Sequence, residues 1–246
     1  AKPAEQTPLV ARLACDVLNE AGVPEGVLNL VNGDGPTLGG WLLPDERIAG
    51  VSFTGSHPSA RVINRQLALR DGPIIPLIAE TGGINCMVVD STALPEQVVD
   101  DVITSAFRSA GQRCSALRVL FVQSDVADGI IELLAGAMKE LVVGDPHKLS
   151  TDVGPVIDQA AHDRISAHLM HLKKTATCIA KSPSADPKLN GYFVEPQAWE
   201  ISSLSALHEE VFGPILHIVR YHSEELDTII KDIRSSKFAL TMGIHS

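Results

Sequence analysis

Apolar and polar residues alternate along this chain in two patterns, one typical of amphipathic helices and the other typical of short buried strands. In residues 7–21 the apolar side chains recur at helical spacing, with Thr7 as the expected N-cap and Gly22 as the stop. Residues 27–31 form an apolar run that ends at the turn sequence Asn-Gly-Asp-Gly-Pro of residues 32–36. This run is typical of a buried strand.

Strand and helix patterns then alternate to the end of the chain. The predicted strands are residues 27–31, 48–53, 74–79, 86–89, 118–122, a short stretch near Thr177, and 215–221. The predicted helices are residues 7–21, 37–43, 58–69, 95–109, 125–142, 158–174 and 224–235. This alternation indicates an α/β fold with a parallel, doubly wound sheet, whose ligands bind at the carboxyl ends of the strands. We place a domain boundary near Gly82 and Gly83.

Composition limits the classes of function. The 246 residues are 45% hydrophobic, which is enough to bury the cores of one or two globular units. The formal net charge is -10 and the basic residues form no cluster, so no nucleic-acid or anionic-membrane surface is expected. No apolar run approaches the roughly 18 residues of a membrane span, so none is expected.

The cysteines indicate a reduced, cytoplasmic compartment, because they lack Cys-x-x-Cys spacing. Three of them lie in apolar patterns and are expected to be packing residues: Cys15, Cys86 and Cys178. Cys114 differs, because the polar sequence Gly-Gln-Arg-Cys-Ser of residues 111–115 joins a predicted helix to a predicted strand. A reactive thiolate needs solvent access and nearby positive charge or backbone N–H groups, for which Arg113 and the turn at Gly111 are candidates.

Glu80 is the candidate base. It follows the apolar run of residues 74–79, and the glycines at 82–83 allow the backbone to bend so that a carboxylate projects from the end of a strand. A partly desolvated carboxylate at such a position is a better proton acceptor. Each residue alone has a more ordinary explanation, since a lone Cys is most often a small buried hydrophobe and a strand-end Glu is most often solvated.

The sequence Glu-Thr-Gly-Gly at residues 80–83, followed by Gly-Gln-Arg-Cys at residues 111–114, resembles the active-site pair of the aldehyde dehydrogenase superfamily. The resemblance implies that Cys114 attacks an aldehyde carbon, that NAD oxidises the thiohemiacetal to a thioester, and that Glu80 activates water to hydrolyse it. The Cys114 backbone N–H would supply half of an oxyanion hole. The family's other donor, an Asn in an Asn-Phe-Pro or Asn-Tyr-Pro motif, has no counterpart in this sequence.

Two motifs resemble the family's segments for the adenosine ribose and the pyrophosphate of the cofactor. Residues 2–8 resemble the ribose segment, which implies that Lys2 and Glu5 bond to ribose hydroxyls and that the carboxylate favours NAD over NADP. Phe-Thr-Gly-Ser at residues 53–56 resembles the turn whose Ser contacts the pyrophosphate, a role that falls to Ser56. Taken alone, a solvated helix entry and an ordinary strand-ending turn would explain both motifs.

A third motif, Glu-Val-Phe-Gly-Pro at residues 210–214, resembles the segment that meets the nicotinamide end of the cofactor. The resemblance implies that Glu210 binds the nicotinamide ribose and that Phe212 lies beside the nicotinamide. A plain turn before the strand at residues 215–221 would explain the glycine and proline, but not the whole pentapeptide.

His168 and His171, with Asp163 upstream, have a spacing that helical metal ligands also use. No cysteine or second carboxylate joins them, so we expect a solvated helix face and no metal site.

Longer segments resemble the dehydrogenase part of the bacterial proline utilisation A family; they are residues 78–85, 105–107, 111–119, 144–146 and 149–155. This resemblance implies oxidation of L-glutamate γ-semialdehyde to L-glutamate by a homo-oligomer, with FAD only in a possible fused proline dehydrogenase outside this chain. It implies an incomplete Rossmann-like NAD-binding domain at residues 1–82, without its first strand. The α/β catalytic domain of the aldehyde dehydrogenase fold would follow at residues 83–246, without its C-terminal end.

We therefore expect this chain to be an internal fragment of such an enzyme, with little activity in isolation. Two alternatives stay open. One is a dehydrogenase for another semialdehyde, such as succinate semialdehyde. The other is a non-catalytic nucleotide-binding or assembly module.

Overall fold

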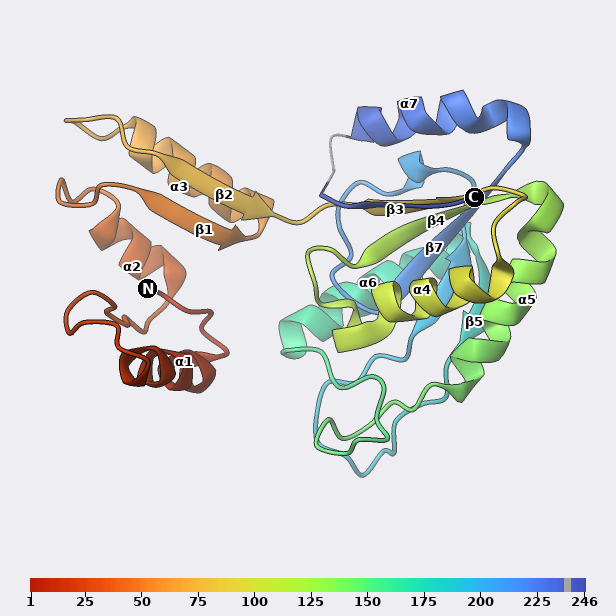
Figure 1. The fold of residues 1–246 in the computed structure, drawn as a ribbon, viewed down its shortest axis with the longest axis horizontal. Helices are drawn as coiled ribbons and strands as arrows, with labels where there is room; N and C mark the ends of the chain where they lie inside the picture. The colour runs from red at the N-terminus through yellow and green to blue at the C-terminus, as the bar shows by residue number, and fades with distance from the viewer. Residues whose placement is uncertain (237–239) are drawn as a thin grey trace. The chain divides into compact units, whose positions relative to one another are not determined.

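The computed structural model describes residues 1–236 and 240–246. It divides into two compact units. The N-terminal unit is Ala1–Thr81 and the C-terminal unit is Gly82–Ser246 (Figure 1). The division falls beside the glycine pair at residues 82–83. The NAD-binding and catalytic roles expected of the two regions remain predictions.

The N-terminal unit contains three helices and a parallel pair of strands. Its elements are α1 (Pro8–Glu20), α2 (Gly35–Leu42), β1 (Val51–Gly55), α3 (His57–Ala68) and β2 (Leu77–Thr81). In the register of the two strands Thr54 lies opposite Glu80, so the carboxyl ends of β1 and β2 share one edge. The predicted helices are confirmed to within two residues at each end. Thr7 is the N-cap residue of α1, although its side chain makes no capping hydrogen bond.

The predicted strand at residues 27–31 is wrong. The two valines that end this run are 69% and 38% exposed, and the run has no strand conformation. Its backbone pairs only briefly with Ala1, whose ammonium donates to Asn29 O (2.7 Å) and whose carbonyl accepts from the Val31 N–H (2.9 Å). Pro3 has no N–H with which to extend this pairing into a ladder.

The C-terminal unit is built on a six-stranded sheet in the order β5-β6-β7-β4-β3-β8. Its strands are β3 (Asn85–Val89), β4 (Leu117–Gln123), β5 (Thr177–Lys181), β6 (Gln197–Glu200), β7 (Ile215–Tyr221) and β8 (Met242–His245). Strand β5 runs antiparallel to β6, and the other pairings in the described part of the chain are parallel. The predicted α/β class with a parallel sheet is confirmed.

Helices lie on both faces of this sheet, with α7 on one side of β3 and α4 on the other in Figure 1. They are α4 (Pro95–Phe107), α5 (Ser124–Glu140), α6 (Gln159–Thr175) and α7 (Leu226–Ser236), with short 3-10 turns η1 (Arg108–Gly111), η2 (Leu204–Ala206) and η3 (Ser223–Glu225). The central strands β3, β4 and β7 are almost continuously apolar and buried, as expected of parallel strands covered on both faces. The core of the unit therefore lies along these three strands.

Two strands were not predicted, β6 and β8. Each has only four residues and pairs with a longer strand, so each owes its conformation to that neighbour more than to its own pattern. Strand β8 lies at the edge of the sheet, and its Met242 and Ile244 are exposed.

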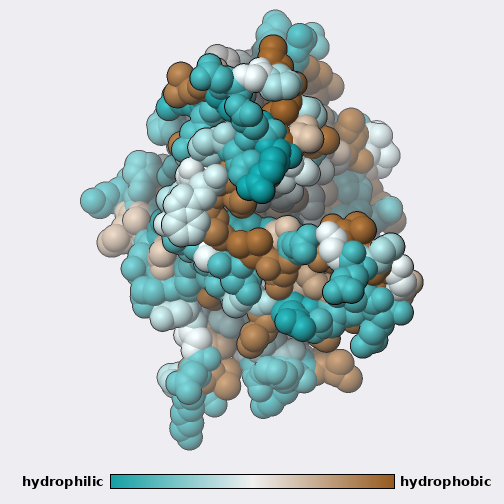
Figure 2. Space-filling view, turned by 90° about the vertical axis from the view of Figure 1, so that its left-hand side faces the viewer, coloured by the Kyte–Doolittle hydropathy of each residue, from teal (hydrophilic) through white to brown (hydrophobic). Residues whose placement is uncertain are grey.

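Apolar surface is left uncovered on the N-terminal unit. Within residues 1–81 the buried hydrophobic residues are Leu38, Leu43 and Ala60, and no residue of α1 is buried. Figure 2 shows hydrophobic residues exposed between hydrophilic ones. The amphipathic pattern that predicts α1 is thus real, but its apolar face contributes no buried side chain. Among residues 1–236 and 240–246, no helix combines the length and the apolar character needed to cross a membrane.

Candidate active site

Cys114 lies on a strained loop between α4 and β4, and its side chain is exposed. The loop contains three consecutive residues with left-handed backbone angles, Ser109 (φ 55°), Ala110 (φ 53°) and Gly111 (φ 64°). This turn ends α4 at Phe107, two residues before the predicted end at residue 109. A non-glycine residue in this conformation costs about 1–3 kcal/mol, so surrounding contacts must hold the loop.

Arg118 supplies the largest group of these contacts. Its side chain is 1% exposed and sits at the start of β4, four residues after Cys114. Its Nη1 donates to Gly111 O (2.7 Å) and Gly213 O (3.2 Å), and its Nη2 donates to Arg113 O (3.0 Å). Nη2 and Nε also donate to Glu210 Oε1, at 2.9 and 3.3 Å. A guanidinium has five N–H donors, and this arrangement gives each of them an acceptor.

The contact to Arg113 O orients the peptide that precedes the Cys114 side chain. The Arg113 carbonyl and the Cys114 N–H belong to one planar trans peptide, in which they point in opposite directions. Because Arg118 binds the carbonyl from the buried side, the Cys114 N–H is directed away from Arg118. Arg113, the cation that the sequence suggested for the thiol, directs its Nε to Ser109 Oγ (3.2 Å).

Burial dominates the electrostatics of the Arg118–Glu210 ion pair. Burial lowers the pKa of Arg118, while the hydrogen bond and charge of Glu210, and more weakly the Cys114 thiolate, raise it. Burial likewise raises the pKa of Glu210, against the opposing effect of Arg118. The Arg118 guanidinium also lies over the ring of Phe212, with Cζ 5.3 Å from the centroid, while 43% of Phe212 stays exposed. Both residues of the predicted nicotinamide segment thus contact Arg118.

Asn85 holds the peptide on the other side of Cys114. This buried residue begins β3, and its Nδ2 donates to Cys114 O (2.7 Å) and Ala116 O (2.8 Å). Its Oδ1 accepts from the Thr241 N–H at 3.0 Å. Arg118 and Asn85 therefore fix the peptides before and after the thiol.

Gln112 joins the same loop to the segment that precedes α6. Its Oε1 accepts from the Ile157 N–H (2.8 Å), and its Nε2 donates to Ser109 O (3.1 Å) and Pro155 O (3.4 Å). Gln112 thus stabilises the left-handed turn by hydrogen bonds to the backbone.

Two motif glycines allow the backbone to approach this cluster closely. A Cβ at Gly111 would overlap the Gly213 carbonyl, and Gly111 also has a positive φ. A Cβ at Gly82 would overlap the Glu210 carboxylate, which Arg118 holds in place. These contacts give a packing reason for glycine at both positions.

The candidate residues of the N-terminal unit form two groups. At the edge shared by β1 and β2, Ser56 caps α3 by accepting from the Ser59 N–H (3.3 Å). Glu80 lies inside β2, one residue beyond the predicted strand end, and is exposed. Glu80 and Cys114 belong to different units, and their approach remains a prediction.

The second group gathers at the turn before α2. Lys2 Nζ donates to Pro3 O (2.6 Å) and Gly33 O (3.4 Å), and Glu5 Oε1 accepts from the Gly35 N–H (2.7 Å). The Lys2 ammonium and the Glu5 carboxylate therefore bind the same turn, although that turn lies much further along the sequence.

The histidine pair on the sheet corrects one expectation. His168 is not on a solvated helix face, because its Nε2 lies 2.9 Å from Nε2 of His217, a buried residue of β7. Burial lowers the pKa of His168 to about 4 and that of His217 to about 3. No group of three or more metal-binding side chains was found among residues 1–236 and 240–246.

The other cysteines also differ from one another. Cys86 is buried, and burial raises the pKa of its thiol to about 12, as fits a packing residue. Cys178 is exposed on β5, so the packing role expected of it is wrong.

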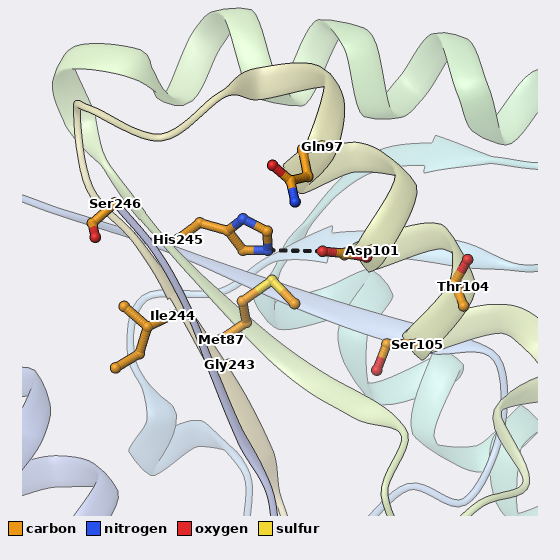
Figure 3. A pocket seen from close by; sticks show the side chains of 9 residues that line it. All are labelled: Met87, Gln97, Asp101, Thr104, Ser105, Gly243, Ile244, His245 and Ser246. Carbon is orange, nitrogen blue, oxygen red and sulfur yellow. Dashed lines mark ion pairs between the residues drawn. The ribbon is translucent and has the colours of Figure 1, made fainter.

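An open depression of about 630 Å³ lies at the β8 edge of the sheet (Figure 3). Its lining includes Met87, and His245 Nε2 lies 3.2 Å from Asp101 Oδ2 across it. Cys114 is not among its lining residues, so we do not assign it to the candidate active site.

Replacing Arg118 by Met should lower the free energy of unfolding by about 3–5 kcal/mol, because the Glu210 carboxylate loses its buried cation. The matched control is Arg220→Met, since Arg220 pairs with Asp128 (2.7 Å) and Glu200 (3.2 Å) at a more exposed site. The control should cost about 1 kcal/mol or less. Urea unfolding at neutral pH measures both, and equal losses would contradict the role given to Arg118.

The histidine pair should make the C-terminal unit less stable in acid. The folded-state pKa values, about 4 for His168 and about 3 for His217, lie below the ordinary 6.5. The unfolded chain therefore binds more protons once the pH falls below about 6.5, and stability falls as the pH drops toward about 4. His217→Leu should reduce the slope of unfolding free energy against pH by about 1 kcal/mol per unit between about pH 6 and pH 4.5. The exposed His208, changed to Gln, is the control, and an unchanged slope in His217→Leu would refute this prediction.

Comparison with known proteins agrees with this architecture. The whole chain, residues 1–246, matches the sequence profile of the aldehyde dehydrogenase family. It is 49% identical over 254 residues to the bifunctional protein PutA of Klebsiella aerogenes, which covers 100% of this chain and 19% of that protein. It is 34% identical over 250 residues to the 1-pyrroline-5-carboxylate dehydrogenase of Geobacillus sp. (strain WCH70), covering 100% of this chain and 48% of that protein.

Solved structures of related proteins share the fold. A crystal structure of a mutant of proline utilization A (PutA) from Bradyrhizobium japonicum has a TM-score of 0.95 and 56% identity, covering 100% of this chain and 25% of that one. PutA from Bdellovibrio bacteriovorus has a TM-score of 0.92 at 29% identity, covering 100% of this chain and 26% of that one. The chain thus spans 19% of the first of the curated relatives. Because the family profile matches along its full length, the chain belongs to the aldehyde dehydrogenase family.

Proposed function

We propose that this chain carries the nucleophile and the base of an NAD-dependent dehydrogenase that oxidises L-glutamate γ-semialdehyde to L-glutamate in proline catabolism. The observation that carries the proposal is an exposed cysteine held, on both sides of its thiol, by buried polar side chains. The names of the relatives supply the substrate class, since 1-pyrroline-5-carboxylate is the cyclic imine that hydrolyses to this aldehyde. The proposal concerns the larger protein of which such a chain would form part.

Cys114 attacks the aldehyde carbon through its sulfur and gives a thiohemiacetal whose oxygen carries the developing negative charge. The Cys114 N–H, directed by the Arg118 contact to Arg113 O, donates to that oxygen. The strained turn at residues 109–111 keeps the sulfur in solvent, where a substrate can reach it.

The donors and acceptors of both units fit NAD. The ammonium of Lys2 and the carboxylate of Glu5 converge on the turn at residues 33–35, a combination that suits ribose hydroxyls. Ser56 caps the twelve-residue α3, whose N-terminus suits a pyrophosphate. Glu210 and the exposed ring of Phe212 would hold the nicotinamide end. NAD, when bound, accepts the hydride that the substrate carbon loses.

Glu80 acts after oxidation. Its carboxylate takes a proton from water as the water oxygen attacks the thioester carbon. The C–S bond then breaks, so the acid is released and the Cys114 thiolate is restored. This role requires Glu80 to project from the end of β2, where the register places it opposite Thr54.

We further propose that the intact protein is a cytoplasmic homo-oligomer and that FAD, if used, binds only in a fused proline dehydrogenase outside this chain. The word bifunctional in the names of the relatives supports a second activity elsewhere in the longer protein.

Replacing Cys114 by Ala in the full-length protein should reduce NAD-dependent oxidation of the semialdehyde by at least about 1,000-fold, because the covalent route is lost. Glu80→Gln should instead allow one round of substrate oxidation and then accumulate a thioester at Cys114, seen as an added mass on the peptide that contains it. The matched control is Cys178→Ala, which removes the other exposed thiol and should leave turnover unchanged. Undiminished turnover in Cys114→Ala would favour a nucleotide-binding or assembly module.

The substrate is tested by comparing kcat/KM for L-glutamate γ-semialdehyde and succinate semialdehyde in the full-length protein. The glutamate aldehyde should be preferred by at least about tenfold, which corresponds to about 1.4 kcal/mol of difference in transition-state binding. Equal values, or preference for succinate semialdehyde, would reject the substrate while leaving the chemistry of Cys114 intact.

A further inference from the structure

Helix α6 contacts the surroundings of Arg118 through two residues that lie one helical turn apart. Ile165 fills the space at Gly213, where a Cβ would overlap its side chain, and Gly213 O is one of the acceptors of Arg118. His168 meets His217 of β7 at 2.9 Å between their Nε2 atoms. The same face of one helix therefore reaches both the turn before β7 and a buried side chain within β7.

His217 in turn reaches the main chain of Arg118. Its Nδ1 lies 2.9 Å from Arg118 O. The parallel ladder between β4 and β7 begins with the pair Val119 and His217, so this contact lies one residue before the ladder starts. The His217 imidazole thus adds a contact between β7 and β4 at Arg118, one residue before the ladder begins.

The Arg118 carbonyl, as an acceptor, determines which ring nitrogens of His217 and His168 carry the protons. A carbonyl only accepts, so the neutral His217 carries its proton on Nδ1 and accepts at Nε2. His168 must then donate from its own Nε2. A proton added to His168 would enter at Nδ1 and leave both bonds in place. A proton added to His217 would enter at Nε2, against the His168 N–H, and break the pair.

Burial is the strongest effect that opposes protonation of the pair, and the charges near it act in the same direction. The groups that act on it are Arg118 on β4 and His171 on α6, both of which are cationic when protonated. On the other neighbouring strand, β6, the residue opposite His217 is the uncharged Trp199. The neutral, doubly bonded arrangement is therefore the stable form at neutral pH.

We propose that His217, oriented by His168, is a positioning residue for the nucleophile: it holds the Arg118 main chain so that the guanidinium can fix the peptide before Cys114. This rests on the proposed role of Cys114, and it adds a contribution from two residues that lie on β7 and α6. The chain of contacts runs from His168 to His217, then to Arg118, then to Arg113 O.

The test measures the reactivity of Cys114 directly, so it does not depend on turnover. The full-length protein is treated at neutral pH with iodoacetamide, and mass spectrometry gives the ratio of the labelling rates of Cys114 and Cys178, two exposed thiols of one molecule. His217→Leu should lower this ratio about three- to tenfold, the factor that corresponds to the loss of one hydrogen bond. His217→Asn, whose amide can donate from the position of Nδ1, should restore most of it.

Two matched controls separate positioning from general loss of stability. Val219→Ala removes buried volume from the same strand and should leave the ratio unchanged. His171→Gln changes an exposed histidine of the same helix and should also leave it unchanged. If His217→Leu does not fold, His168→Leu serves in its place, with a smaller fall in the ratio expected.

The proposal is overturned if folded His217→Leu keeps the wild-type ratio, if His217→Asn behaves like His217→Leu, or if Val219→Ala lowers the ratio as much. A failure of the proposed function would look different. Cys114→Ala would then retain turnover, whatever the labelling ratios show.

Discussion

The Arg118 side chain carries a positive charge although only 1% of it is exposed. The conformation of the backbone around Cys114 depends on how that charge is compensated. The five donors of Arg118 meet one carboxylate and three backbone carbonyls, from residues that lie up to 95 positions from it in the sequence. A buried charge that lost these partners would destabilise the fold by several kcal/mol. The cluster therefore has one low-energy arrangement, and the loop that carries the thiol shares it.

The left-handed turn at residues 109–111 shows why such an anchor is needed. Two non-glycine residues adopt a backbone conformation that they normally avoid, which on its own would favour a different loop. Arg118, Asn85 and Gln112 each bind backbone groups of this loop, and together they offset its strain. The result is an exposed sulfur on a rigid support, which suits a nucleophile better than a mobile loop does.

Local periodicity predicted most of the fold, because helices such as α5 and strands such as β4 and β7 carry their own pattern. It failed where conformation depends on a distant partner. Residues 27–31 are as apolar as a strand but find no ladder, whereas the four-residue β6 and β8 become strands by pairing with β7 and β3. Cys114 could be proposed from its polar neighbours and Glu80 from its glycines, since both signals are local.

The residues that hold the thiol could not be assigned from the sequence, because their roles arise from contacts across the sheet. A signal was present all the same. Arg118 and His217 are buried polar residues within the mostly apolar strands β4 and β7, and Asn85 stands at the start of β3. A buried polar side chain needs partners, so such positions mark places where a strand does more than fill the core. The partners themselves become visible only in three dimensions.

The mobility of the Cys114 amide tests the central claim most directly. The 15N order parameter of this amide should be about 0.85 in the wild-type protein, as in rigid backbone, and should fall below about 0.6 in Arg118→Lys. A lysine keeps the charge but cannot bind four acceptors with one planar group. An order parameter that stays at its wild-type value in Arg118→Lys would contradict the claim that Arg118 fixes the backbone at Cys114.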